Sequence, residues 1–357
     1  MFCMNYRMSC HPNGVAGRSD GRVYGTWDFK WPQGYRIKVA FQEWNGGAVD
    51  FDTVRFVPEN ASEKAVIGTA RGYGRLTRIV ECLASRWLSG SPNIRFEFDH
   101  EHRVATKVTA RNCDNTYDVL VSLSPLPRFQ PRMVLQIGGA EGAKPAKYFL
   151  PGSELGRYAQ RVDYGVPTTY LGKRRYLRAS LEDYFGSQEF QHWTIHEFGH
   201  VLGLVHEQQN PNIFPRIHLK PLDQVVAILR RSLGYPEPPH GASRTLVDGE
   251  EITKDEVEEE LSQAWPALPG NPFCDFREYG PGVPIDDTSS VMFHLYWARL
   301  LKGGSEDAPP VYYSKPHERD LAALQQMYPG RKTASAGARP SRKRASRRTV
   351  SGSPARG

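Results

Sequence analysis

Residues 196–206 read HEFGHVLGLVH, and this stretch says most about the fold and its chemistry. The surrounding apolar pattern predicts a helix that starts near Ser187. His196 and His200 are four residues apart on that helix, so their rings leave the same face one turn apart. Two nitrogens that bind one tetrahedral zinc at about 2.1 Å stand about 3.4 Å from each other, which adjacent helical turns can supply. The pair is therefore a candidate metal site.

Two further residues of this stretch complete the pattern. Glu197 is too close in sequence to be a ligand alongside both histidines, but it is well placed to hold a water molecule at the metal. In an unbroken helix, His206 would lie about 15 Å along the axis from His196. Gly203 can adopt a positive φ, end the helix and turn the chain back, so that His206 can approach the metal. Three imidazoles with an open fourth position are the layout of a catalytic zinc site.

The longer string HEFGHVLGLVHEQQNP, from residue 196, resembles the metzincin zinc peptidases, whose signature is HExxHxxGxxH with a methionine turn. Because Glu207 directly follows the third histidine, the chain resembles the astacin-like group, in its microbial and fungal type. Met292, in Ser-Val-Met, matches the methionine turn, and the resemblance implies that it forms an apolar floor beneath the metal. The stretches at 87–124 and 314–329 resemble the helix and strands before the zinc helix and the C-terminal helix of that family.

The resemblance implies a zinc endopeptidase with one catalytic Zn²⁺ held by His196, His200 and His206. Zinc polarises the scissile carbonyl and activates water, and Glu197 then acts as general base and general acid. Many astacin-like chains carry a tyrosine two residues after the methionine, as a transition-state donor or an extra ligand. In this chain that position is His294, and Tyr296 stands two residues further on, so either side chain reaches the site or neither does.

Substrate binding is also implied by the resemblance. In metzincins an edge strand above the cleft pairs with extended substrate through main-chain hydrogen bonds. The stretch TYDVLVS holds the corresponding place in the order of elements, so Val119 and Val121 are expected to lie on that edge strand. The partner is accordingly a protein or peptide substrate, and the protein is expected to act as a monomer.

Periodicity elsewhere predicts an α+β fold. Alternating residues predict strands at 35–41, 93–98, 117–123 and 133–138. Helices are expected at 76–87 before Gly90, at 221–233, after the capping-box spacing of Thr253 and Glu256, and at 317–327. Together with the resemblance, this order favours a metzincin-like architecture. The expected architecture has a twisted mixed β-sheet, a backing helix and the zinc helix, above a mostly irregular and helical lower subdomain.

The charge is unevenly distributed along the chain. The 357 residues carry 46 Lys and Arg against 39 Asp and Glu, a net charge of +7. Nine of the basic residues and no acidic residue lie in 331–357, so the preceding part has 37 basic against 39 acidic residues. We interpret 1–24 as a loose N-terminal arm, 25–330 as the catalytic domain with its cleft near 196–206, and 331–357 as a disordered basic tail. Nucleic-acid binding is expected only through that tail.

Other sequence features narrow the protein class. No apolar run approaches the roughly 20 residues of a membrane span. Five cysteines, an odd number at low density, exclude a disulfide scaffold but leave one or two bridges open, and no CxxC pair exists for a zinc ribbon. The resemblance points to secretion, but the N-terminal residues show no secretory signal. The protein therefore stays inside the cell, leaves by another route, or has a true start upstream.

Three other histidines are expected to lie outside the metal-binding set. His192 precedes His196 by one turn, but three successive turns cannot serve one metal, so we expect a buried supporting role. His100 and His102 flank Glu101 in what reads as an exposed polar turn.

The rival function is a catalytically silent metzincin-like binding protein, with polyanion binding through the basic tail. The intact Glu197 argues against it, because a pure binding module has no use for that carboxylate.

Overall fold

The structure is a computed structural model that describes residues 30–90, 92–104, 117–125, 152–153, 156–157, 167–173, 179–204, 224, 244–245, 251–252, 290–292, 304–305, 307 and 309–330. The N-terminal arm, the strand expected at 133–138, the helix expected after Thr253 and the basic tail lie outside the described residues. So does the helix expected at 221–233, apart from residue 224.

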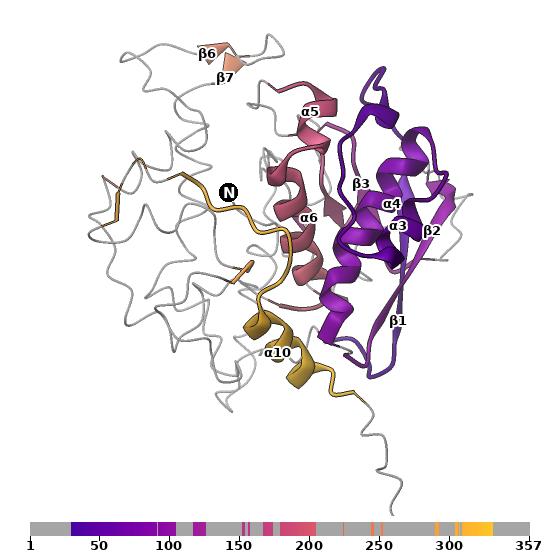
Figure 1. Ribbon diagram of the computed structural model, residues 1–357, viewed down its shortest axis with the longest axis vertical. Coiled ribbons are helices and arrows are strands. Elements are labelled where there is room, and N and C mark those ends of the chain that lie inside the picture. Colours follow the sequence, from indigo (N-terminus) through magenta and orange to yellow (C-terminus); the bar gives the residue numbers. More distant parts are fainter. Residues whose placement is uncertain are drawn as a thin grey trace, which may run out of the picture.

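A five-stranded mixed sheet forms one layer of the fold, with the strand order β2-β1-β3-β5-β4 (Figure 1). The strands are β1 (Arg36–Gln42), β2 (Arg95–Val104), β3 (Val119–Ser122), β4 (Gly152–Ser153) and β5 (Thr169–Tyr170). Neighbours pair in parallel except β4, which runs antiparallel to β5 at the border of the sheet. A separate antiparallel pair joins β6 (Arg244–Thr245) and β7 (Glu251–Ile252). The expected mixed sheet is confirmed.

The strand register shows which side chains share the covered face of the sheet. Val39 pairs with Val119, and Phe41 pairs with Val121, so these four apolar side chains share one face. All four belong to the large buried cluster that also contains the helix residues. The expected strands at 35–41 and 117–123 are therefore confirmed as β1 and β3.

Strand β2 is longer than expected and irregular. The alternation at 93–98 predicts only its first half, and the polar stretch DHEHR extends it to Val104. Val39 pairs with Phe98, but Phe41 pairs with Arg103, so the register shifts between these two pairs. An irregular strand at the border of a sheet exposes one side to solvent, so its polar sequence does not show the apolar alternation of a buried strand.

Two helices, α4 (Gly72–Ser85) and α6 (Gln188–Val201), contact the sheet. The other helices of the described ranges are α3 (Ala61–Ile67), which packs on α4, α5 (Leu181–Phe185), which packs on α6, and α10 (Glu318–Met327). Two short 3₁₀ turns are η2 (Phe51–Thr53) and η3 (Arg86–Gly90). Helix α4 is amphipathic, and its buried side includes Leu76, Ile79 and Leu83. With η3 it confirms the predicted helix at 76–87, and Gly90 ends the helical run as expected.

The core therefore lies between the sheet and the helix pair α4 and α6, which run side by side (Figure 1). Helix α10 lies near the C-terminal end of α6, and Tyr328 just beyond α10 donates its hydroxyl to the Leu202 carbonyl at 2.8 Å. Two residues that are 126 positions apart in sequence are thus joined in the core.

Within the described ranges, no helix has both the length and the apolar character needed to cross a membrane.

Candidate metal centre

Helix α6 carries the histidine pair and is buried almost all round. Ser187 is its N-cap, and its hydroxyl accepts the Phe190 N–H at 3.1 Å, which satisfies one of the open donors of the first turn. His196, Glu197 and His200 are at most 1 % exposed. Burial of three polar side chains on one short stretch costs free energy, so the surroundings must provide specific partners.

Each histidine has a backbone partner on Nδ1. His196 Nδ1 lies 2.8 Å from the Val291 carbonyl, and His200 Nδ1 lies 2.7 Å from the Leu204 carbonyl. A carbonyl oxygen only accepts, so both Nδ1 atoms carry the proton, and both Nε2 atoms present lone pairs when the rings are neutral. Burial lowers the pKa of His196 to about 4, against a smaller opposite effect of the Val291 hydrogen bond, and so favours the neutral ring.

The two Nε2 atoms lie 3.2 Å apart, with the rings edge-to-face. Two neutral rings with Nδ1–H tautomers cannot hydrogen-bond to each other at this contact, because both facing atoms are acceptors. The separation is close to the roughly 3.4 Å expected for two nitrogens on one tetrahedral zinc. The donor set and its spacing therefore fit a zinc ion.

The end of α6 follows the pattern expected from Gly203. This residue has φ +93°, its N–H donates to the His200 carbonyl at 2.8 Å, and the Leu204 N–H donates to the Gly199 carbonyl at 3.0 Å. These two bonds form a Schellman motif, which needs a left-handed residue at the position of Gly203. The motif also brings the Leu204 carbonyl back onto His200, so one turn both ends the helix and orients a histidine.

The third expected ligand, His206, lies outside the described residues, as do His294 and Tyr296. Within the part of the chain that the structure describes, no group of three His, Cys, Asp or Glu side chains is arranged to hold a metal. The Schellman motif turns the chain back toward the pair at Leu204, two residues before His206. A third ligand from this segment remains a prediction.

The expected methionine turn lies directly beside α6. Ser290, Val291 and Met292 are at most 1 % exposed, and Val291 supplies the carbonyl that accepts from His196. A Cβ at Gly199 would overlap Met292 Sδ, so the glycine is what allows the turn to approach the helix this closely.

His192 is fully buried one turn before His196, and its burial agrees with the sequence. Its ring stacks on His196 with centroids 6.0 Å apart, and its Nδ1 accepts the Tyr313 N–H at 3.1 Å. Burial, followed by the electrostatic effect of the neighbouring His196 ring, keeps the pKa of His192 well below its usual value. This neutral ring anchors the segment before α10 against the helix.

The expected substrate edge strand is wrong as assigned. Val119 and Val121 lie on β3, which pairs with β1 on one side and β5 on the other, so its backbone groups are already used. Sequence order alone does not show this, because the two-residue strands β4 and β5 are too short to leave a periodic signal. The border strand on this side of the sheet is β4, which contacts α6.

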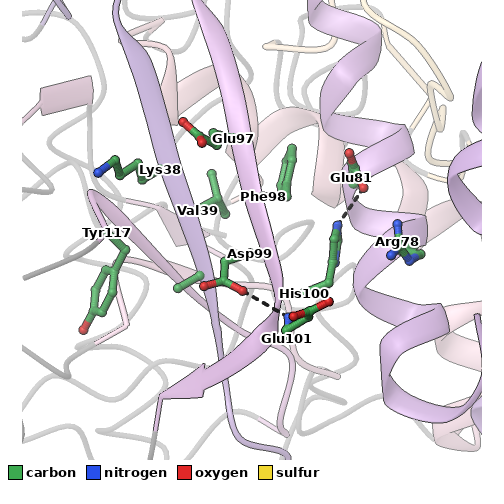
Figure 2. A pocket seen from close by; sticks show the side chains of 11 residues that line it. Lys38, Val39, Arg78, Glu81, Glu97, Phe98, Asp99, His100, Glu101 and Tyr117 are labelled. Atoms are coloured by element: carbon green, nitrogen blue, oxygen red, sulfur yellow. Dashed lines mark hydrogen bonds and ion pairs between the residues drawn. The ribbon is translucent and has the colours of Figure 1, made fainter. Parts of the chain in front are cut away.

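His100 is also placed differently from the expectation of an exposed turn. It lies in β2 and is half-buried, with Nε2 2.6 Å from Glu81 Oε2 and Nδ1 3.0 Å from Thr77 Oγ1. Figure 2 shows His100 in a pocket over β2 and α4. His196, Glu197 and His200 do not line this pocket. The pocket belongs to a different part of the molecule from the histidine pair.

Sequence reasoning missed the groups that orient the histidines. The Val291 and Leu204 carbonyls are backbone atoms, and Asp320, which holds the turn at Val291, lies far along the chain. One signal was available, because His317 and Asp320 have the spacing of a helix capping box. That spacing predicts the start of α10 but not its contact with the methionine turn.

Comparisons with known proteins add little to this geometry. No protein-family model and no curated protein sequence matches the chain. The solved structures that are similar include two entitled "Structure of myroilysin" and "Crystal structure of myroilysin", both at 19% sequence identity. The first has a TM-score of 0.42 and covers 85% of this chain and 96% of its own; the second has a TM-score of 0.38 and covers 86% and 89%. At this level of similarity, the function has to be inferred from the chain's own residues.

Proposed function

We propose that the protein is a zinc-dependent endopeptidase of the metzincin type, similar to the astacin-like group. One observation carries the proposal. The Nε2 atoms of His196 and His200 face each other at 3.2 Å, while both Nδ1 atoms donate to backbone carbonyls. Such second-layer hydrogen bonds are typical of histidines that bind zinc, because they fix the tautomer and the orientation of the ring.

In this proposal, His196 and His200 hold the metal together with His206. Zinc would supply a Lewis acid that polarises the scissile carbonyl. The side chains of His196, Glu197 and His200 are buried, and the low dielectric of a buried site would strengthen its electrostatic interactions. Met292, packed against Gly199, would form the apolar floor.

Glu197 would carry the proton transfers. It follows His196 directly on α6 and is fully buried, so its carboxylate is held on a rigid helix close to the pair. It would remove a proton from the attacking water and deliver it to the leaving nitrogen as the C–N bond breaks. Both transfers use one carboxylate, which returns to its starting state after each cycle.

The test is hydrolysis of casein and of a quenched fluorescent peptide library by the full chain, with and without a zinc chelator. Glu197→Gln should retain zinc and lose activity by about 10²–10⁴-fold, the usual contribution of a general base. Glu189→Gln is the matched control, because it makes the same change on the same helix about 12 Å away along the axis.

The outcomes separate the competing functions. Full activity of Glu197→Gln would sink the assigned role of Glu197. Zinc binding by the wild type without any peptide cleavage would favour the silent binding protein instead.

A further inference from the structure

Helix α10 begins against the methionine turn, and one carboxylate joins the two. Asp320, the third residue of α10, is 2 % exposed. It accepts the Ser290 hydroxyl at 2.5 Å, the Val291 N–H at 3.0 Å and the His317 N–H at 2.9 Å. Burial raises the pKa of Asp320, and these three donors oppose the shift by stabilising the carboxylate.

Val291 connects this carboxylate to the metal centre. Its N–H donates to Asp320, and its carbonyl accepts from His196 Nδ1 at 2.8 Å. Ser290 closes the turn, because its hydroxyl donates to Asp320 and also accepts the Met292 N–H at 3.1 Å. A displacement of the turn would therefore move the acceptor that orients His196.

We propose that Asp320 is a positioning residue of the metal centre, which fixes the methionine turn so that the Val291 carbonyl aims His196 Nε2 toward His200. This inference rests on the proposed function and names a residue that acts on it through Val291. The competing role is purely structural, because Asp320 also completes the capping box of α10 through the His317 N–H.

The contact favours a carboxylate, because an ionised acceptor makes the stronger hydrogen bonds. Both oxygens of Asp320 are used as acceptors, Oδ1 by Ser290 and Oδ2 by Val291 and His317. An asparagine offers one oxygen to the Val291 and His317 N–H groups, and the Ser290 hydroxyl would have to rotate and accept from the amide at the other position. Because the hydrogen bonds would also lose their ionised acceptor, Asp320→Asn should weaken the hold on the turn while it keeps the size of the side chain.

The experiment compares four variants of the full chain by zinc affinity, in competition with a chromophoric chelator, and by the visible absorption of the cobalt(II)-loaded protein. Asp320→Asn and Ser290→Ala weaken the hold on the turn. Glu318→Gln removes an exposed acid from the same first turn of α10, and His317→Ala removes the N-cap side chain without changing the methionine turn.

We expect Asp320→Asn to raise the zinc dissociation constant by about 10-fold or more, as is usual when an outer-shell partner is lost, and to change the cobalt spectrum. Ser290→Ala should do the same to a smaller extent. Glu318→Gln should match the wild type, and His317→Ala should lower the melting temperature alone.

Ser290→Ala keeps the inference testable if Asp320→Asn does not fold, because it removes only one hydroxyl. Wild-type zinc affinity and cobalt spectra in the folded Asp320 and Ser290 variants would overturn the inference and leave the proposed function intact. A folded wild-type protein that binds no zinc would overturn both.

Discussion

His196 and His200 hold their Nε2 atoms toward each other inside the protein. Their Nδ1 protons are directed to carbonyl oxygens, so two nitrogen lone pairs face each other at 3.2 Å inside the protein. Repulsion between the lone pairs and the loss of hydration both cost free energy, which the rest of the fold must offset. Arrangements of this kind are expected where the site is built for a ligand and not for stability.

His196→Asn tests this arrangement at the level of one residue. Asparagine can place an amide N–H near the position of Nδ1, and so keep the bond to Val291, but it has no atom at the position of Nε2. We expect the metal-free variant to be at least as stable as the metal-free wild type. Zinc at about 100 times its dissociation constant should stabilise only the wild type, by about 2.7 kcal/mol.

Thermal unfolding with and without zinc measures both effects. His196→Ala is the control for the Val291 bond, because it leaves that carbonyl without its donor and should cost about 1 kcal/mol more than asparagine. Equal stabilisation of the wild type and of His196→Asn by zinc would show that the histidine pair does not bind the ion.

At the scale of elements, α6 depends on two glycines for different reasons. Gly203 provides the positive φ that ends the helix and brings the Leu204 carbonyl to His200. Gly199 provides space, because a Cβ there would overlap Met292 Sδ and lie 2.8 Å from Trp87 Cζ2. Sequence reasoning identifies the first role from spacing alone, whereas the second depends on a turn that lies about 90 residues further on.

Gly199→Ala should therefore destabilise the protein, although alanine is the better helix former by about 1 kcal/mol. We expect a net loss of about 1–3 kcal/mol, the usual cost of overpacking a core, together with weaker zinc binding as the turn is pushed away. Urea unfolding measures the first effect.

Gly74→Ala in α4 is the matched control, because a Cβ there meets no atom within 4 Å and the same propensity gain should stabilise the protein. A Gly199→Ala protein that is as stable as Gly74→Ala would contradict the close packing of the methionine turn on α6.

At the scale of the whole molecule, the site is assembled from distant segments. The sheet with α4 and α6 supplies the histidines and Glu197, and the methionine turn with α10 arrives much later in the chain. Buried side chains secure the junction at the end of α6, where Trp31 Nε1 donates to the Val201 carbonyl at 2.7 Å and Tyr328 donates to Leu202. These bonds satisfy carbonyls that the last turn of a helix leaves open.

This assembly explains which predictions from sequence were possible. Local signals identify β1, β3, α4, α6 and α10, because alternation, amphipathicity and caps are encoded in neighbouring residues. The place of β3 inside the sheet was predicted incorrectly, because Val119 and Val121 have the same alternation in a central strand as in an edge strand. The backbone carbonyls that orient the histidines have no sequence signature, because any residue can supply them.

The most direct test of the central claim is the zinc content of the purified full chain after dialysis against dilute zinc, measured by mass spectrometry. We predict one zinc per chain in the wild type and in Glu197→Gln, and none in His200→Ala, which removes one of the two facing nitrogens. A folded wild-type protein without zinc, or equal zinc content in the wild type and in His200→Ala, would contradict the account.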